Sequence, residues 1–172
     1  MEYMFMPLKR YAEFSGRSRR MEYWMWFVFL VLLYIAFWVL AMVIGGAALM
    51  TGDPRAAMAA GGGMLIIGAL FFLVWLALLI PGIAVGVRRL HDTDRTGWWL
   101  LAPIAPYILV WIGAAMAISG STGIGGILSL IGMLGAVVLG ITLIVFMFLD
   151  GTKGPNRYGP DPKGRADAQV FA

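Results

Sequence analysis

The sequence contains no cysteine and only one histidine, His91, among its 172 residues. The absence of cysteine excludes disulfides, thiolate nucleophiles and cysteine-ligated metals. Charged side chains and histidine are missing altogether from three long stretches, residues 24–52, 56–87 and 96–149. Proton relays, ion pathways and substrate sites inside a membrane usually need ionisable groups. These stretches therefore argue against such chemistry within a bilayer.

What fills the stretches is apolar. The chain is 61% hydrophobic, against roughly 45–50% in soluble domains. Uncharged apolar runs of 18 or more residues are typical of membrane spans, because about 20 residues of helix cross a hydrocarbon core of about 30 Å. Helices are the expected form, because backbone amides in lipid must be hydrogen-bonded internally. We predict an all-α integral membrane protein, a single membrane domain over residues 1–172 that forms a four transmembrane helix bundle. The predicted spans cover about residues 24–50, 62–87, 97–118 and 124–149.

The basic residues are distributed unevenly around these spans. Five lie before the first span, three between the second and third, and four after the last, whereas Arg55 alone occupies the first loop. Because cytoplasmic segments carry an excess of Lys and Arg, this positive-inside bias predicts cytoplasmic N- and C-termini. Residues 1–22 are then a cytoplasmic basic segment. Apolar residues at helical spacing predict an amphipathic helix there; they are Met4, Phe5, Leu8, Tyr11 and Ala12. Residues 150–172 form a cytoplasmic Gly/Pro-rich tail.

Small residues and prolines predict how the spans pack and bend. Gly132, Ala136 and Gly140 recur at four-residue spacing, which allows close helix approach in a membrane. Gly82 and Gly86 make a similar pair in the second span. Prolines are expected to bend the second and third spans in their cytoplasmic halves. They are Pro81, Pro103 and Pro106.

Three polar strings flank the spans on the predicted cytoplasmic face. They are FSGRSRRMEYW at 14–24, RRLHDTDRTGWW at 88–99 and DGTKGPNRYGPDP at 150–162. In this order they resemble the signature of a family of small bacterial inner-membrane proteins known as domain of unknown function 805. The resemblance covers about Phe14 to Pro162. It implies a multi-pass protein of the bacterial inner (cytoplasmic) membrane with four spans, and it implies no activity.

The three strings together hold eight arginines or lysines and five carboxylates, which leaves two interpretations open. Arginine–carboxylate pairs can form an ion-pair network that locks the helix ends. The candidate members are Glu22, His91, Asp92, Asp94 and Asp150. Alternatively, basic juxtamembrane residues with a tryptophan rim can bind anionic headgroups, a phosphate or a partner. The candidates are Arg17, Arg19, Arg20, Arg88, Arg89, Arg95, Trp98, Trp99, Asn156 and Arg157.

Enzymatic chemistry is the weaker interpretation. His91 with Asp92 and Asp94 has the residue types of a metal or acid–base site, but no second histidine or nucleophile accompanies them. We therefore predict no catalytic residue, no metal and no cofactor. Nucleic acid is not an expected partner, since every basic string adjoins a predicted membrane helix.

The function predicted from the sequence is non-enzymatic. The cytoplasmic cluster would bind membrane lipids, chiefly anionic phospholipid, or dock the chain as an accessory subunit onto a larger membrane complex or into a homo-oligomer. A small transporter or channel is the alternative, although an ion pore needs a charged ring or exposed carbonyls. A lipid-modifying membrane enzyme is less favoured.

Overall fold

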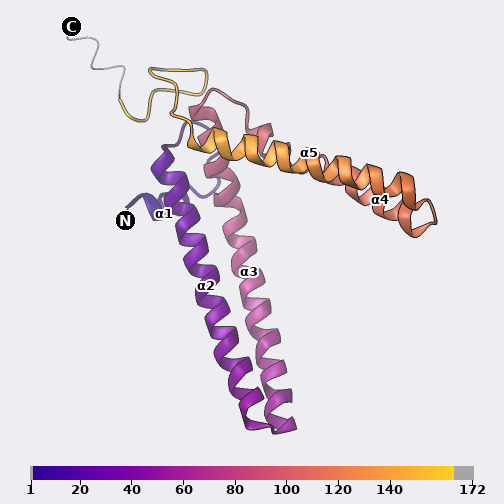
Figure 1. Ribbon diagram of the computed structural model, residues 1–172. Coiled ribbons are helices and arrows are strands. Elements are labelled where there is room, and N and C mark those ends of the chain that lie inside the picture. The colour runs from indigo at the N-terminus through magenta and orange to yellow at the C-terminus, as the bar shows by residue number, and fades with distance from the viewer. Residues whose placement is uncertain (1, 165–172) are drawn as a thin grey trace. The chain divides into compact units, whose positions relative to one another are not determined.

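The computed structural model describes residues 2–164, except for the side chain of Leu49. Residues 165–172, the end of the predicted cytoplasmic tail, lie outside the described residues. The elements in chain order are α1 (Glu2–Lys9), α2 (Arg20–Thr51), α3 (Pro54–Asp92), the 3-10 helix η1 (Gly97–Leu101), α4 (Tyr107–Ile118) and α5 (Thr122–Phe148) (Figure 1). Within the described chain the only strand-like pairing is one isolated bridge, Asn156 with Gly159. The all-α prediction is confirmed.

Three of these helices are long and apolar enough to cross a membrane: α2, α3 and α5. They contain 32, 39 and 27 residues. At about 1.5 Å per residue each exceeds a hydrocarbon core of about 30 Å. Apolar side chains cover nearly all sides of these helices, which is the composition expected of helices that face lipid.

The predicted third span is not one continuous helix. η1 occupies residues 97–101, turns follow, and α4 begins only at Tyr107. Pro103 and Pro106 have no backbone N–H and cannot donate the hydrogen bonds of a helix. The two prolines therefore interrupt the helix instead of bending it. α4 has 12 residues and extends about 18 Å, so the fourth membrane crossing stays a prediction.

The first loop is much shorter than predicted. We expected the Gly/Ala-rich residues 56–63 to belong largely to a loop, but α3 begins at Pro54 and includes them. Asp53 caps this helix, because its carboxylate accepts the backbone N–H of Arg55 at 2.9 Å and proline suits the first helical position. Gly52 supplies the left-handed turn, with φ of 63°. Sequence patterning underestimated the helix because alanine is a strong helix former.

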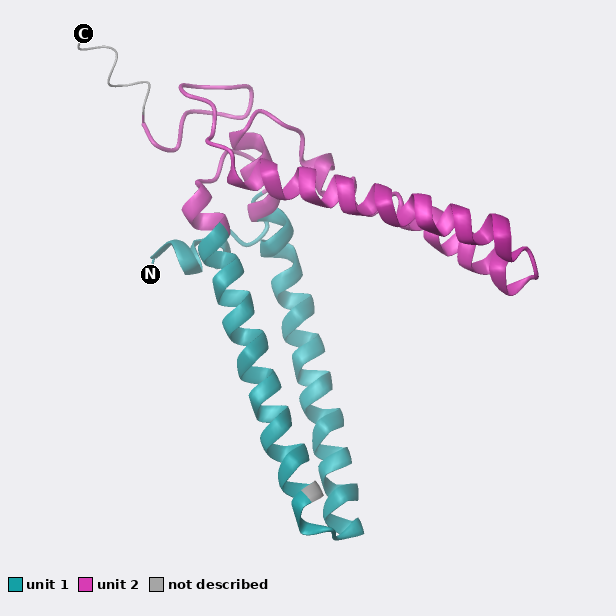
Figure 2. Cartoon of the chain, viewed as in Figure 1, with its two compact units in different colours: residues 1–13, 24–84 teal, residues 14–23, 85–172 magenta. Residues whose placement is uncertain are grey.

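The chain divides into two compact units (Figure 2). Of the described residues, unit 1 contains 2–13 and 24–84, and unit 2 contains 14–23 and 85–164. Unit 1 includes α1 and most of the α2–α3 hairpin, in which Phe37 meets Phe71 edge-on with ring centroids 5.0 Å apart. The N-terminal segment forms a helix, α1, which ends at Lys9 and so is shorter than the predicted helical spacing, which ran to Ala12.

In unit 2, α4 and α5 pack so closely that their glycines meet the opposite backbone. A Cβ on Gly132 would lie 2.7 Å from the carbonyl oxygen of Pro106, and one on Gly125 would lie 2.5 Å from that of Gly113. Gly132 and Ala136 are buried as predicted. Gly140 is not part of this contact, since a Cβ there would meet nothing within 4 Å. Close approach of backbones therefore holds this hairpin together.

This contact gives a signed prediction for two glycines of α5. Gly132→Ala should lower the thermal unfolding midpoint in detergent, because overpacking against backbone costs about 1–3 kcal/mol. Gly126 has open space around its Cα, so Gly126→Ala should leave the midpoint unchanged or raise it through better helix propensity. Equal effects of the two substitutions would contradict the close α4–α5 contact.

Candidate functional site: a polar cluster at the helix ends

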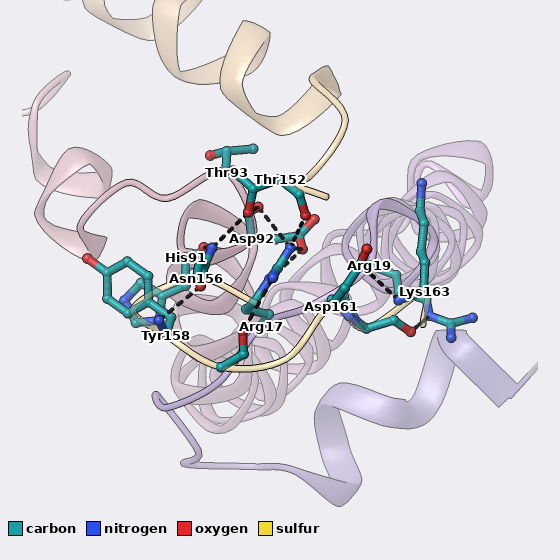
Figure 3. Close-up of polar contacts among 12 residues, drawn as sticks. Arg17, Arg19, His91, Asp92, Thr93, Thr152, Asn156, Tyr158, Asp161 and Lys163 are labelled. Atoms are coloured by element: carbon teal, nitrogen blue, oxygen red, sulfur yellow. Dashed lines mark hydrogen bonds and ion pairs between the residues drawn. The ribbon is translucent and has the colours of Figure 1, made fainter. Parts of the chain in front are cut away.

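The three polar strings meet within unit 2, and Arg17 lies at their centre. Gly16, with φ of 80°, turns the chain so that Arg17 is buried at 6% exposure. The Arg17 guanidinium pairs with the Asp92 carboxylate at 2.9 Å and donates to the carbonyls of Thr152 at 2.6 Å and Gly154 at 2.7 Å (Figure 3). A planar fork of five donors suits this set of acceptors. Arg17 therefore joins the first string to the other two.

The arginines in the last turns of α3 are also buried and paired. Arg88, fully buried, forms an ion pair with Glu22 at 2.9 Å. Arg89, equally buried, pairs with Asp92 and donates to the carbonyls of Met147 and Leu149. The last carbonyls of a helix have no intrahelical donor, so Arg89 caps α5.

The end of α3 is capped by its own turn and by the tail. The Asp94 N–H donates to the His91 carbonyl and the Arg95 N–H to the Leu90 carbonyl, each at 3.0 Å. This is a Schellman motif, whose left-handed position is usually glycine. Asp94 occupies it with φ of 58°. The tail adds the Thr152 N–H, which donates to the Asp92 carbonyl at 2.9 Å.

The imidazole ring of His91 packs against the tail. Its ring stacks on that of Tyr158, with centroids 3.8 Å apart and planes within 4°. Its Nδ1 lies 3.1 Å from the Gly16 carbonyl, and since a carbonyl only accepts, Nδ1 carries the proton. Among the residues described, no group of three His, Asp or Glu side chains is placed to hold a metal ion.

Other charged residues of the three strings form more exposed ion pairs. Asp150 pairs with both Arg20 and Lys163 at 2.9 Å, and Arg157 pairs with Asp94 at 3.2 Å, with both side chains about half exposed. These exposed pairs contribute little to stability, typically about 0–1 kcal/mol each.

Arg95 lies over the ring of Phe146, 3.9 Å from its centroid. Trp99 meets the same ring edge-on at 5.1 Å. The neighbouring Trp98 is 77% exposed. Arg19 donates to the carbonyl of Pro162 at 2.7 Å. These residues surround the buried pairs.

The sequence-predicted residues therefore divide between a buried network and its surroundings. Within the described cluster, Glu22 and Asp92 pair with the buried arginines, whereas His91 makes no ion pair. Asn156 donates to the His91 carbonyl at 2.9 Å, which makes it a capping residue. Whether any of the basic residues also binds a ligand stays a prediction.

Sequence reasoning singled out too little of the tail. It named Asp150, Asn156 and Arg157 but missed Thr152, Tyr158 and Gly151. A side chain on Gly151 would overlap the Asp92 carboxylate, so this position needs glycine. The signal was the GTKGPNRYGPDP string itself, whose turn residues suit a fixed loop.

Fold and site thus define a helical membrane protein whose charged residues gather mainly at the helix ends. The family described as "Protein of unknown function (DUF805)" matches residues 11–160, and the chain belongs to it. Inner membrane protein YhaH of Escherichia coli (strain K12) is 36% identical over 165 residues, covering 95% of this chain and 98% of the relative. Inner membrane protein YhaI of the same strain is 31% identical over 163 residues, covering 95% and 97%. No solved structure matches.

The resemblance drawn from the three strings is confirmed by these matches. The names of the relatives and the three apolar helices place the chain in the inner membrane as a multi-pass protein. The family description and these names assign no activity.

From the contacts of Arg17 in the buried network, we predict that a positive charge without the guanidinium fork cannot replace this side chain. Arg17→Lys keeps the charge but loses the fork, and Arg17→Ala leaves Asp92 with one partner fewer. We expect Arg17→Ala to cost about 3–5 kcal/mol of stability and Arg17→Lys to recover only part of it. The measurement is the thermal unfolding midpoint, with protease cleavage of residues 150–162 as a second readout. The matched control is Arg157→Ala, which removes an exposed pair; an equal loss in that variant would refute the central role of Arg17.

Proposed function

We propose that this protein binds anionic phospholipid headgroups at the cytoplasmic leaflet through an outer basic rim. The rim is defined as Arg20, Arg95, Lys153, Arg157 and Lys163. The observation that carries the proposal is an excess of positive charge. Residues 14–23, 88–99 and 150–164 hold nine basic and five acidic side chains, so four positive charges are left uncompensated.

Most of this excess lies outside the buried network. Arg17, Arg88 and Arg89 share Glu22 and Asp92, which leaves one net charge inside. Outside the network, Asp150 forms ion pairs with both Arg20 and Lys163. Anionic leaflets attract basic juxtamembrane residues by roughly 1 kcal/mol each, which is comparable with an exposed ion pair. Rim residues can therefore exchange a carboxylate partner for a lipid phosphate.

Trp98 supports a position at the membrane surface. It precedes α4 in the chain, is 77% exposed, and tryptophan favours the headgroup boundary. In this proposal the fully buried Arg88 and Arg89 stabilise the folded cluster and do not contact lipid. The rim residues contact the phosphate groups.

The rim can be tested by native mass spectrometry of protein released from nanodiscs with equal phosphatidylglycerol and phosphatidylethanolamine. We expect wild type to retain phosphatidylglycerol preferentially. Arg95→Gln with Lys153→Gln and Arg157→Gln should lower this preference about a hundredfold, because three contacts of roughly 1 kcal/mol each are lost, with little change in thermal stability. Asp94→Asn with Asp150→Asn should raise it, because rim cations lose competing carboxylates.

Unchanged lipid preference in both variants would refute the rim. If the retained species were instead a protein subunit or a second copy, accessory docking or homo-oligomerisation would replace lipid binding as the function.

We also propose that the chain crosses the membrane four times with both termini in the cytoplasm. The support is the distribution of Lys and Arg, of which Arg55 alone, in the first turn of α3, lies at the end of the α2–α3 hairpin opposite the chain termini of that hairpin. In this topology η1, the following turns and α4 together make the third crossing, and residues 119–121 face the periplasm.

Because the chain has no cysteine, introduced cysteines report this topology directly. A membrane-impermeant maleimide should label Ser121→Cys in intact cells and Ser15→Cys only after the membrane is permeabilised. Labelling of Ser121→Cys only after permeabilisation would overturn the four-span topology.

A further inference from the structure

Pro81 creates a defect in α3 that the N-terminal segment repairs. Proline has no backbone N–H, so the carbonyl four residues earlier, that of Ala77, loses its helical donor. The hydroxyl of Tyr11 donates to this same carbonyl oxygen at 2.5 Å. Tyr11 and Ala77 are 66 residues apart in the chain, and both belong to unit 1. A long-range side-chain bond thus replaces a local backbone bond.

Other contacts hold the N-terminal segment on the same unit. Phe5 of α1 meets Phe29 of α2 edge-on, with centroids 5.6 Å apart. Pro7 is fully buried. Tyr11 itself is 39% exposed. The chain after α1 thus brings the Tyr11 hydroxyl to the Ala77 carbonyl while the Tyr11 side chain stays partly exposed.

The bond falls near the calculated edge of the hydrocarbon. Arg55, the one basic residue between the first two apolar stretches, lies in the first turn of α3 and precedes Ala77 by 22 positions, or about 33 Å of helix. With Arg55 placed at one edge of a hydrocarbon core about 30 Å thick, Ala77 lies close to the opposite edge. Tyrosine is enriched at this depth, and the neighbouring Arg10–Glu13 ion pair at 2.7 Å is polar.

We propose that residues 2–13 form a strap that closes α3 at its proline-broken turn, with Tyr11 as the residue that engages the Ala77 carbonyl. While the strap is in place the carbonyl is satisfied at the membrane boundary. When it leaves, the carbonyl must find water or a headgroup donor, because an unpaired acceptor in lipid is costly. The strap is independent of the proposed lipid-binding rim.

A double-mutant cycle isolates this bond, with hydrogen–deuterium exchange of residues 6–13 in nanodiscs as the readout. Tyr11→Phe removes only the hydroxyl and should speed exchange of this segment about five- to tenfold, the effect of losing one bond to a poorly solvated carbonyl. Pro81→Ala restores an N–H donor to the Ala77 carbonyl. In the Pro81→Ala background, Tyr11→Phe should therefore change exchange less than twofold.

Tyr34→Phe is the matched control. It removes a hydroxyl from an exposed tyrosine of α2 in the same unit and should leave exchange of residues 6–13 unchanged. The proposal is overturned if Tyr11→Phe has the same effect with Pro81 and with Ala at that position. It is equally overturned if Tyr11→Phe does not speed exchange, since the aromatic contacts of α1 would then hold the segment alone.

Discussion

The buried carboxylate of Asp92 is the group on which the polar cluster depends. It stands at the end of α3 and accepts both Arg17, from the segment before α2, and Arg89, which caps α5. Burying charges is costly unless each is paired and hydrogen-bonded. Here the guanidinium groups also satisfy carbonyls left open at the helix ends and in the tail. One acidic side chain therefore fixes three segments far apart in the sequence.

This arrangement separates two uses of arginine within one short region. Arg17, Arg88 and Arg89 are buried and engaged by acceptors of the chain itself. Arg157 and Arg20 make exposed pairs that solvent screens. A buried inner network with exposed outer pairs is the arrangement on which the proposed binding of anionic headgroups rests.

Proline interrupts the helices in two different ways. Pro81 remains inside a continuous α3, and a side chain from another segment satisfies the exposed carbonyl. Pro103 and Pro106 lie three residues apart, and the chain between η1 and α4 is not a regular helix at all. A single missing donor can be replaced from outside the helix, whereas two in succession end it. The result is one long helix and one shortened helix from similar apolar sequences.

The sequence by itself determined the membrane class, the long helices and the family. These follow from local properties: apolar run length, turn residues and three strings in order. It also indicated that an ion-pair network could form at the helix ends. Only the tertiary structure decided that Asp92 pairs with Arg17 and Arg89, that Glu22 pairs with Arg88, and that His91 stacks on Tyr158. Several arginines compete for few carboxylates, so the pairing depends on which backbone segments approach one another. That approach is a long-range property of the folded chain, which residue types and their spacing do not specify.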